Sequence, residues 1–144
     1  MPEERLSKLA DVIVGYSTSI RSGDEVRIEG HLPTTPLMRE LFRSALRAGG
    51  HPSATLIVDE AIEAQLEEGN DEQVEWVPPD ARWNLEQGDV WIALDGAENT
   101  KHLSGADPAK LARRLKAREP YQLRYLERSE RGEFRWVLCG FPTS

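Results

Sequence analysis

The 144-residue sequence contains only one cysteine, Cys139, so no disulfide can form within the chain. Cys139 lies in an apolar stretch, and we interpret it as a small core residue rather than a redox centre. The sequence also lacks an apolar run near the ~18–20 residues that a membrane-spanning helix needs, and its N-terminus lacks the basic and apolar regions of a signal peptide. These absences predict a cytoplasmic protein with no membrane partner.

An excess of basic residues is missing as well. The formal net charge is −7, and we find no interleaving of basic and aromatic residues of the kind that binds single-stranded nucleic acid. Because nucleic-acid phosphates require a positively charged face, the composition predicts no nucleic-acid partner.

Several sequence motifs for nucleotide and hydrolase chemistry are absent. The segment 30–36 carries one glycine where a dinucleotide-binding fingerprint needs three, and neither a P-loop nor a Gly-x-Ser-x-Gly nucleophile motif occurs. A phospho-receiver would need a lysine after the last strand, where Gly140 is followed by Phe-Pro-Thr. A phosphate or carboxylate at the start of the helix at Pro36, with Thr34 and Thr35 as donors, remains an alternative to simple capping by these threonines.

What the sequence does contain is a regular alternation of strand and helix patterns. Apolar residues at helical spacing predict a first helix that ends by the turn at 22–24, and a short strand follows at 26–30. Thr35 and Pro36 are typical of a helix N-cap and first position, and 54–58 reads as a strand covered on both faces. A helix is then expected from Asp59.

The second half continues the alternation after an irregular crossover at 69–88. Strands are predicted at 90–94 and 134–139, with a helix between them that begins at Asp107 and ends at Pro120. We interpret the four tryptophans, Trp76, Trp83, Trp91 and Trp136, as core residues. The fold class predicted is α/β, a mainly parallel sheet with flanking helices in a Rossmann-like three-layer arrangement, without the dinucleotide fingerprint.

Residues that follow the predicted strands are the candidate site of such a sheet, because ligands bind beyond the carboxyl ends of parallel strands. They are Glu29, Gly30, His31, Asp59, Glu60, Asp95, Gly96 and Gly140. His31 with Asp59 or Asp95 would suit an acid-base pair or two metal ligands. The alternative is that the acids cap helices or form turns and that His31 is solvated. His51 and His102 show no metal-ligand spacing with His31.

Several longer stretches resemble the amino-terminal part of the thermophilic metallo-aminopeptidases, the family of aminopeptidase T and aminopeptidase S. The resemblance is carried by the segments 9–17, 22–30, 36–52, 91–99 and 103–110, and by the final Gly140-Phe-Pro-Thr143. The Trp-Ala that often follows that turn in the family is missing here. The similarity extends over essentially the whole chain. Each segment alone is a weak indication of the family, and the segments are moderately specific for it when taken together.

The resemblance implies a two-domain enzyme that removes N-terminal amino acids from peptides with a pair of divalent metal ions (Zn, Co or Mg), commonly as a homodimer. The family's metal ligands lie in its carboxyl-terminal domain, so we assign no catalytic, cofactor-binding or metal-ligating residue to this chain. The sequence stops on Pro142-Thr143-Ser144, directly after a strand pattern. We therefore expect residues 1–144 to be a single α/β domain at the amino terminus of a longer enzyme, inactive alone and shaping access to the catalytic site. The alternative is a stand-alone α/β module that binds a small ligand or ion near His31, Asp59 and Asp95.

Overall fold

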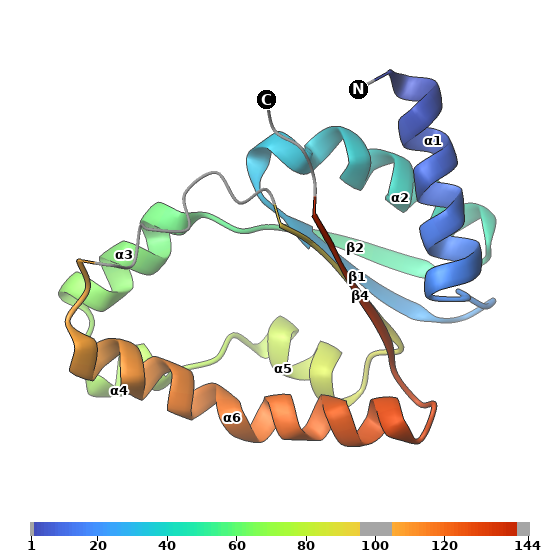
Figure 1. Ribbon diagram of the computed structural model, residues 1–144. Coiled ribbons are helices and arrows are strands. Elements are labelled where there is room, and N and C mark those ends of the chain that lie inside the picture. The colour runs from blue at the N-terminus through green and yellow to red at the C-terminus, as the bar shows by residue number, and fades with distance from the viewer. Residues whose placement is uncertain (1, 96–104, 141–144) are drawn as a thin grey trace.

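The computed structural model describes residues 2–95 and 105–140 (Figure 1). Four strands form one sheet in the order β2-β1-β3-β4, and every neighbouring pair is parallel. The strands are β1 (Glu25–Gly30), β2 (His51–Leu56), β3 (Val90–Asp95) and β4 (Arg135–Gly140). The predicted fold class, a parallel α/β sheet, is confirmed.

Helices cover the two faces of this sheet. Figure 1 shows α1 and α2 on one face, with α3 to α6 along the other. The helices are α1 (Glu3–Val12), which continues into a π-helical turn (Ile13–Ser17), α2 (Thr35–Arg47) after a 3-10 turn (Leu32–Thr34), α3 (Asp59–Glu68), α4 (Asp71–Glu75), α5 (Pro79–Glu86) and α6 (Pro108–Glu130). The result is the expected three-layer arrangement.

The hydrophobic core lies between the sheet and the helices α1 and α2. Because side chains alternate along a strand, Val26 and Ile28 of β1 point into this core, as do Val90, Ile92 and Leu94 of β3. They meet apolar side chains of α1 and α2, namely Leu6, Ala10, Leu37, Met38 and Leu41. At roughly 1.5–3 kcal/mol for each large side chain, this burial is the main stabilising contribution to the fold.

The opposite face is joined to α6 mainly by aromatic contacts. The ring of Tyr125 lies 5.7 Å from Trp91, 6.0 Å from Phe134 and 5.8 Å from Trp136, between ring centroids. Next to this cluster, the buried Arg128 of α6 donates hydrogen bonds to the carbonyl oxygens of Leu85 and Gly88. These contacts fix the carboxyl-terminal half of α6 to the sheet and to α5.

The structure corrects the expectation for the second strand. It runs over His51–Leu56 rather than 54–58, and it is an edge strand whose Ala54 and Leu56 are exposed. The apolar run continues to Val58, so its last two residues belong to the connection into α3 and not to the strand.

Three further expectations were wrong. Helix α6 does not end at Pro120 but continues to Glu130, because the flanking parts of the helix pack on α4 and α5 and offset the one hydrogen bond that proline removes. The crossover at 69–88 contains the short helices α4 and α5. Trp76, Trp83 and Trp136 are 55 %, 54 % and 39 % exposed, and so are not core residues.

Candidate functional site

The carboxyl ends of all four strands meet at one edge of the sheet. Gly30 pairs in register with Leu56 of β2 and Leu94 of β3, and Asp95 pairs with Gly140. The order β2-β1-β3-β4 places the topological switch point between β1 and β3, where ligands of such folds bind. The predicted convergence of the strand ends is confirmed, and binding at this edge stays a prediction.

His31 and Asp59 meet at this edge. His31 follows β1 and Asp59 is the first residue of α3, and the His31 Nε2 and Asp59 Oδ1 atoms lie 3.2 Å apart. Their side chains are 24 % and 21 % exposed. The Nδ1 atom of His31 is buried and has no hydrogen-bond partner within residues 2–95 and 105–140. The expected proximity of these two side chains is confirmed, and His31 is a partly buried residue rather than a solvated one.

The other candidates do not complete a constellation in the part of the chain that the structure describes. Glu60 is exposed, and Glu29 pairs with Arg27 of its own strand. Asp95 ends β3, but its side chain lies outside the described residues, as do Gly96 and His102. His51 opens β2 at the opposite edge of the sheet.

The turn after β1 is tightly built. An added Cβ at Gly30 would lie 2.3 Å from Oγ1 of Thr34, so glycine is required for this close approach. The Thr34 hydroxyl donates to the carbonyl oxygen of His31 at 2.7 Å, and the Thr35 hydroxyl donates to that of Leu32 at 2.9 Å. Both hydroxyls bind backbone oxygens, and α2 begins at Thr35 without a side-chain cap. The threonine hydroxyls thus donate within the turn, and Thr35 does not have the capping role expected of it.

The described residues do not complete a metal centre by themselves. No group of three or more His, Cys, Asp and Glu side chains gathers within residues 2–95 and 105–140. The His31–Asp59 pair offers two ligating groups, whereas protein metal sites commonly use three or more. We therefore derive no metal-dependent step from the residues of this chain. Among the described helices, none has the length and apolar character that crossing a membrane would demand.

A second group of polar residues was missed at the level of sequence. Arg27 and Glu29 alternate with the core residues of β1, so they face the side of the sheet opposite α1 and α2. Arg27 donates to Asp80 of α5 at 2.7 Å and to Glu29 at 3.3 Å. The signal was the strict alternation of Glu25-Val-Arg-Ile-Glu-Gly30, since a central parallel strand is normally apolar on both faces.

Comparison with known proteins agrees with this architecture. Residues 2–144 match the family described as thermophilic metalloprotease (M29). Wild-type AmpT from Thermus thermophilus has a similar structure, with a TM-score of 0.74 and 23 % sequence identity. The match covers 96 % of this chain and 36 % of the AmpT chain, so this chain spans about a third of the length of that relative. No curated protein matches the chain. The match over residues 2–144 shows that the chain belongs to the thermophilic metalloprotease (M29) family.

Proposed function

We propose that residues 1–144 form the amino-terminal domain of a two-domain, metal-dependent aminopeptidase that removes N-terminal amino acids from peptides. The observation that carries the proposal is the family match over residues 2–144. The similarity to about a third of the AmpT chain is consistent with a further region that this sequence does not include. The divalent metal pair, zinc, cobalt or magnesium, is bound by that carboxyl-terminal region.

In this proposal the chain is inactive by itself and shapes the route to the catalytic site. The described residues supply one histidine–carboxylate pair at the sheet edge, and a hydrolase of this class needs metal ligands besides. The chain therefore contributes one side of the route to the catalytic site and a surface on which the other domain docks. We propose the cytoplasm as the location of the protein.

Exposed apolar side chains support the proposal that another domain or a second copy covers part of this domain. Leu115, Leu123 and Leu126 of α6 are 54 %, 62 % and 44 % exposed, and Leu138 on the edge strand β4 is 64 % exposed. Burial of such side chains against another domain or a second copy would be favourable. The partners proposed are the protein's own carboxyl-terminal domain, peptide substrates and a homodimer mate.

The test compares two proteins prepared in the same way: the complete product of the gene, and residues 1–144 alone. Each is treated with chelator, reloaded with zinc, cobalt or magnesium, and assayed for release of N-terminal residues from small peptides. The proposal predicts metal-stimulated release by the complete product and none by residues 1–144. A folded, metal-loaded complete product that left such peptides intact would contradict it.

The second candidate function is a stand-alone module that binds a small ligand or ion at the sheet edge. The observation in its favour is the contact between His31 and Asp59, together with the unpartnered Nδ1 atom of His31 in the described structure. It predicts that a divalent cation stabilises residues 1–144 and that His31→Ala abolishes this stabilisation. A matched His51→Ala variant, at the opposite edge of the sheet, is the control.

A further inference from the structure

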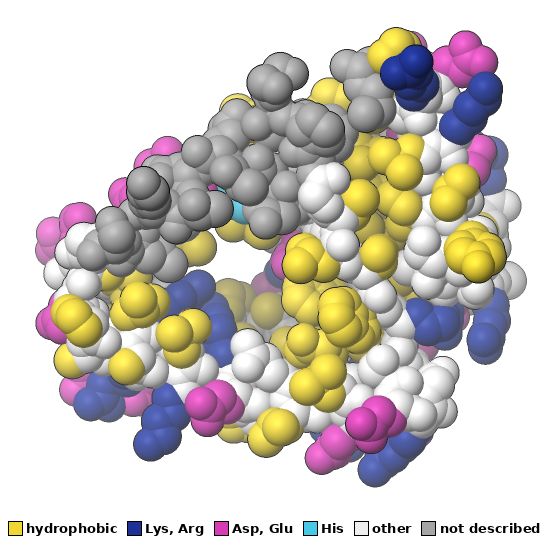
Figure 2. Space-filling model, in the orientation of Figure 1, with side chains coloured by type: hydrophobic (Ala, Val, Ile, Leu, Met, Phe, Trp, Pro, Cys, Tyr) yellow, Lys and Arg dark blue, Asp and Glu magenta, His cyan; other side chains and the backbone are white. Residues whose placement is uncertain are grey.

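A cavity of about 540 Å³ lies between the sheet and the helices α3, α5 and α6. It is on the face opposite the hydrophobic core, and Figure 2 shows the molecule hollowed in this region, with Lys or Arg side chains at the margin. Its sheet side is formed by β1, β2 and β3, including Arg27, Glu29 and Trp91. A volume of this size is sufficient for a small organic molecule.

The helix α6 turns an unusual set of residues toward this cavity. Arg114, Arg118, Tyr121 and Tyr125 all line it. Their spacing of four, three and four residues places them on one stripe of the helix. The stripe that an amphipathic helix normally fills with aliphatic side chains is occupied here by two cations and two phenols, whereas leucines of the same helix are exposed.

The two arginines give the cavity a positive charge that no carboxylate of the described residues balances by an ion pair. Of the other charged residues in the lining, Arg27 is paired with Glu29 and Asp80. Arg114 donates to the uncharged Gln65 at 2.8 Å, and no carboxylate forms an ion pair with Arg114 or Arg118 within the described residues. Burial and the neighbouring charge of Arg118 lower the pKa of Arg114 to about 10, and burial also lowers the pKa of Arg118. Arg114 therefore remains charged at neutral pH.

Two hydrogen-bond donors in the lining lack acceptors in the part of the chain that the structure describes. Nη1 of Arg118 and Nε1 of Trp91 are both buried and have no hydrogen-bond partner among residues 2–95 and 105–140. A buried donor without an acceptor loses its hydrogen bonds to water without replacement, and this cost is larger when the donor is charged. Two such donors from different elements, α6 and β3, border the same cavity. An acceptor-rich ligand would relieve both costs.

We propose that this cavity binds a small organic oxyanion, whose carboxylate or phosphate oxygens accept hydrogen bonds from Arg114, Arg118 and Nε1 of Trp91. Its apolar body would lie against Tyr121 and Tyr125. Guanidinium groups bind such oxyanions through charge-assisted hydrogen bonds, and flat aromatic walls suit a ring. Neither His31 nor Asp59 is among the described residues that line this cavity, and the proposal uses no metal, so it stands whether or not the proposed peptidase function holds.

The test measures binding of phenyl phosphate and of benzoate to the complete gene product by calorimetry and by the shift of the melting temperature, at constant ionic strength. Three proteins are compared: wild type, Arg118→Met, and the control Arg131→Met, which removes an exposed arginine just beyond α6. We expect at least one ligand to stabilise the wild type and Arg131→Met equally. We expect Arg118→Met to bind about tenfold or more weakly, because a charge-assisted hydrogen bond is lost.

The two ligands share a phenyl ring and differ in their anionic group, so the one that binds more tightly identifies phosphate or carboxylate as the preferred group. No stabilisation of the wild type by either ligand, or equal binding by wild type and Arg118→Met, overturns the proposal. If Arg118→Met does not fold, Trp91→Phe replaces it, because this variant keeps an aromatic ring and removes only the Nε1 donor. Unchanged affinity in Trp91→Phe would then overturn the proposal.

Discussion

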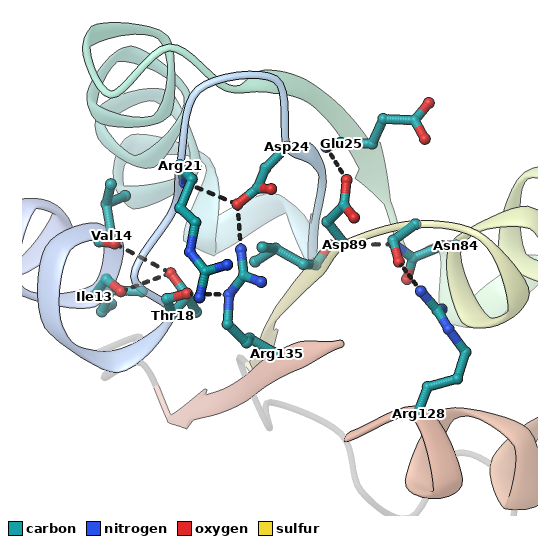
Figure 3. Close-up of polar contacts among 12 residues, drawn as sticks. Ile13, Val14, Thr18, Arg21, Asp24, Glu25, Asn84, Asp89, Arg128 and Arg135 are labelled. Carbon is teal, nitrogen blue, oxygen red and sulfur yellow. Dashed lines mark hydrogen bonds and ion pairs between the residues drawn. The ribbon is translucent and has the colours of Figure 1, made fainter. Parts of the chain in front are cut away.

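Asp24, in the turn that leads into β1, accepts a hydrogen bond from Nη2 of Arg135, the first residue of β4 (Figure 3). The same Asp24 oxygen accepts the backbone N–H of Arg21 at 2.8 Å, and Nε of Arg135 donates to the carbonyl oxygen of Thr18 at 2.7 Å. The Arg135 and Asp24 side chains are 18 % and 13 % exposed. Arg135 thereby ties the last strand to the segment between α1 and β1.

Replacement of Arg135 by methionine should therefore be costly. Loss of the guanidinium leaves the mostly buried Asp24 carboxylate without its cation, and breaking such a pair costs roughly 3–5 kcal/mol. Urea denaturation should show this loss for Arg135→Met. The control Arg124→Met, which removes an exposed arginine paired with Glu127, should change the free energy of unfolding by less than about 1 kcal/mol. Equal effects of the two substitutions would contradict the structural role of the pair.

Gly30 and Gly140 offer a matched comparison at the carboxyl edge of the sheet. A Cβ at Gly30 would meet Thr34 Oγ1 at 2.3 Å and Leu94 Cβ at 3.1 Å, whereas no atom of the described residues lies within 4 Å of a Cβ at Gly140. Gly30→Ala should lower the free energy of unfolding by about 1–3 kcal/mol through overpacking. Gly140→Ala should stay within about 0.5 kcal/mol of the wild type. Thermal denaturation of both variants checks this, and an unaffected Gly30→Ala would refute the close approach.

The forked geometry of the Arg128 guanidinium, rather than its charge, should account for its contribution to stability. Its two terminal nitrogens bind the carbonyl oxygens of Leu85 at 2.9 Å and Gly88 at 2.5 Å, and its guanidinium lies 5.1 Å from the centroid of the Phe134 ring. Lysine keeps the charge but cannot bind two carbonyl oxygens in the same forked geometry. Arg128→Lys should destabilise the protein by about 1–3 kcal/mol in chemical denaturation. A neutral result would show that the charge alone is sufficient.

The Arg27–Asp80 contact predicts a pH dependence of stability. Burial raises the pKa of Asp80, but the hydrogen bond and charge of Arg27 outweigh it, and the net pKa lies below its ordinary value of 3.8. The unfolded chain therefore binds a proton more readily than the folded one, so the stabilisation is present above pH 3.8 and is lost as the pH falls below it. Because Asp80 is 57 % exposed, the contribution is below about 1 kcal/mol.

The variant Asp80→Asn isolates this contribution. Its free energy of unfolding should fall below that of the wild type at pH 6, and the difference should shrink between pH 4 and pH 2. Urea titrations at several pH values measure both curves. A constant difference across this range would mean that Asp80 acts through packing or helix capping instead.

The sheet and the convergence of its strand ends could be predicted because their signals are local. Apolar runs with turn residues between them gave β1 and β3 within a residue or so, and parallel topology then placed Gly30, His31 and Gly140 at one edge. Contact between His31 and Asp59 followed from that topology. The exposed edge position of β2 could not be predicted in this way, because strand order depends on tertiary packing rather than on composition.

The cavity was missed for a related reason. Pro120 predicts the end of the helix, which separates Arg114 and Arg118 from Tyr121 and Tyr125, the continuation of the same stripe. The packing of α6 on α4 and α5, together with the contact of Tyr125 with Trp91, keeps the helix continuous and turns this stripe toward the sheet. The alternation of Arg27 and Glu29 with core residues in β1 was the available clue to a polar face.

The central claim is that this chain is one domain of a larger metallo-aminopeptidase, and the intact mass of the native gene product in its source cells tests it most directly. Residues 1–144 have a mass of 16.2 kDa. The account predicts a product well above this mass. A native product of the same mass as this chain would contradict the two-domain enzyme and leave the stand-alone binding module as the better account.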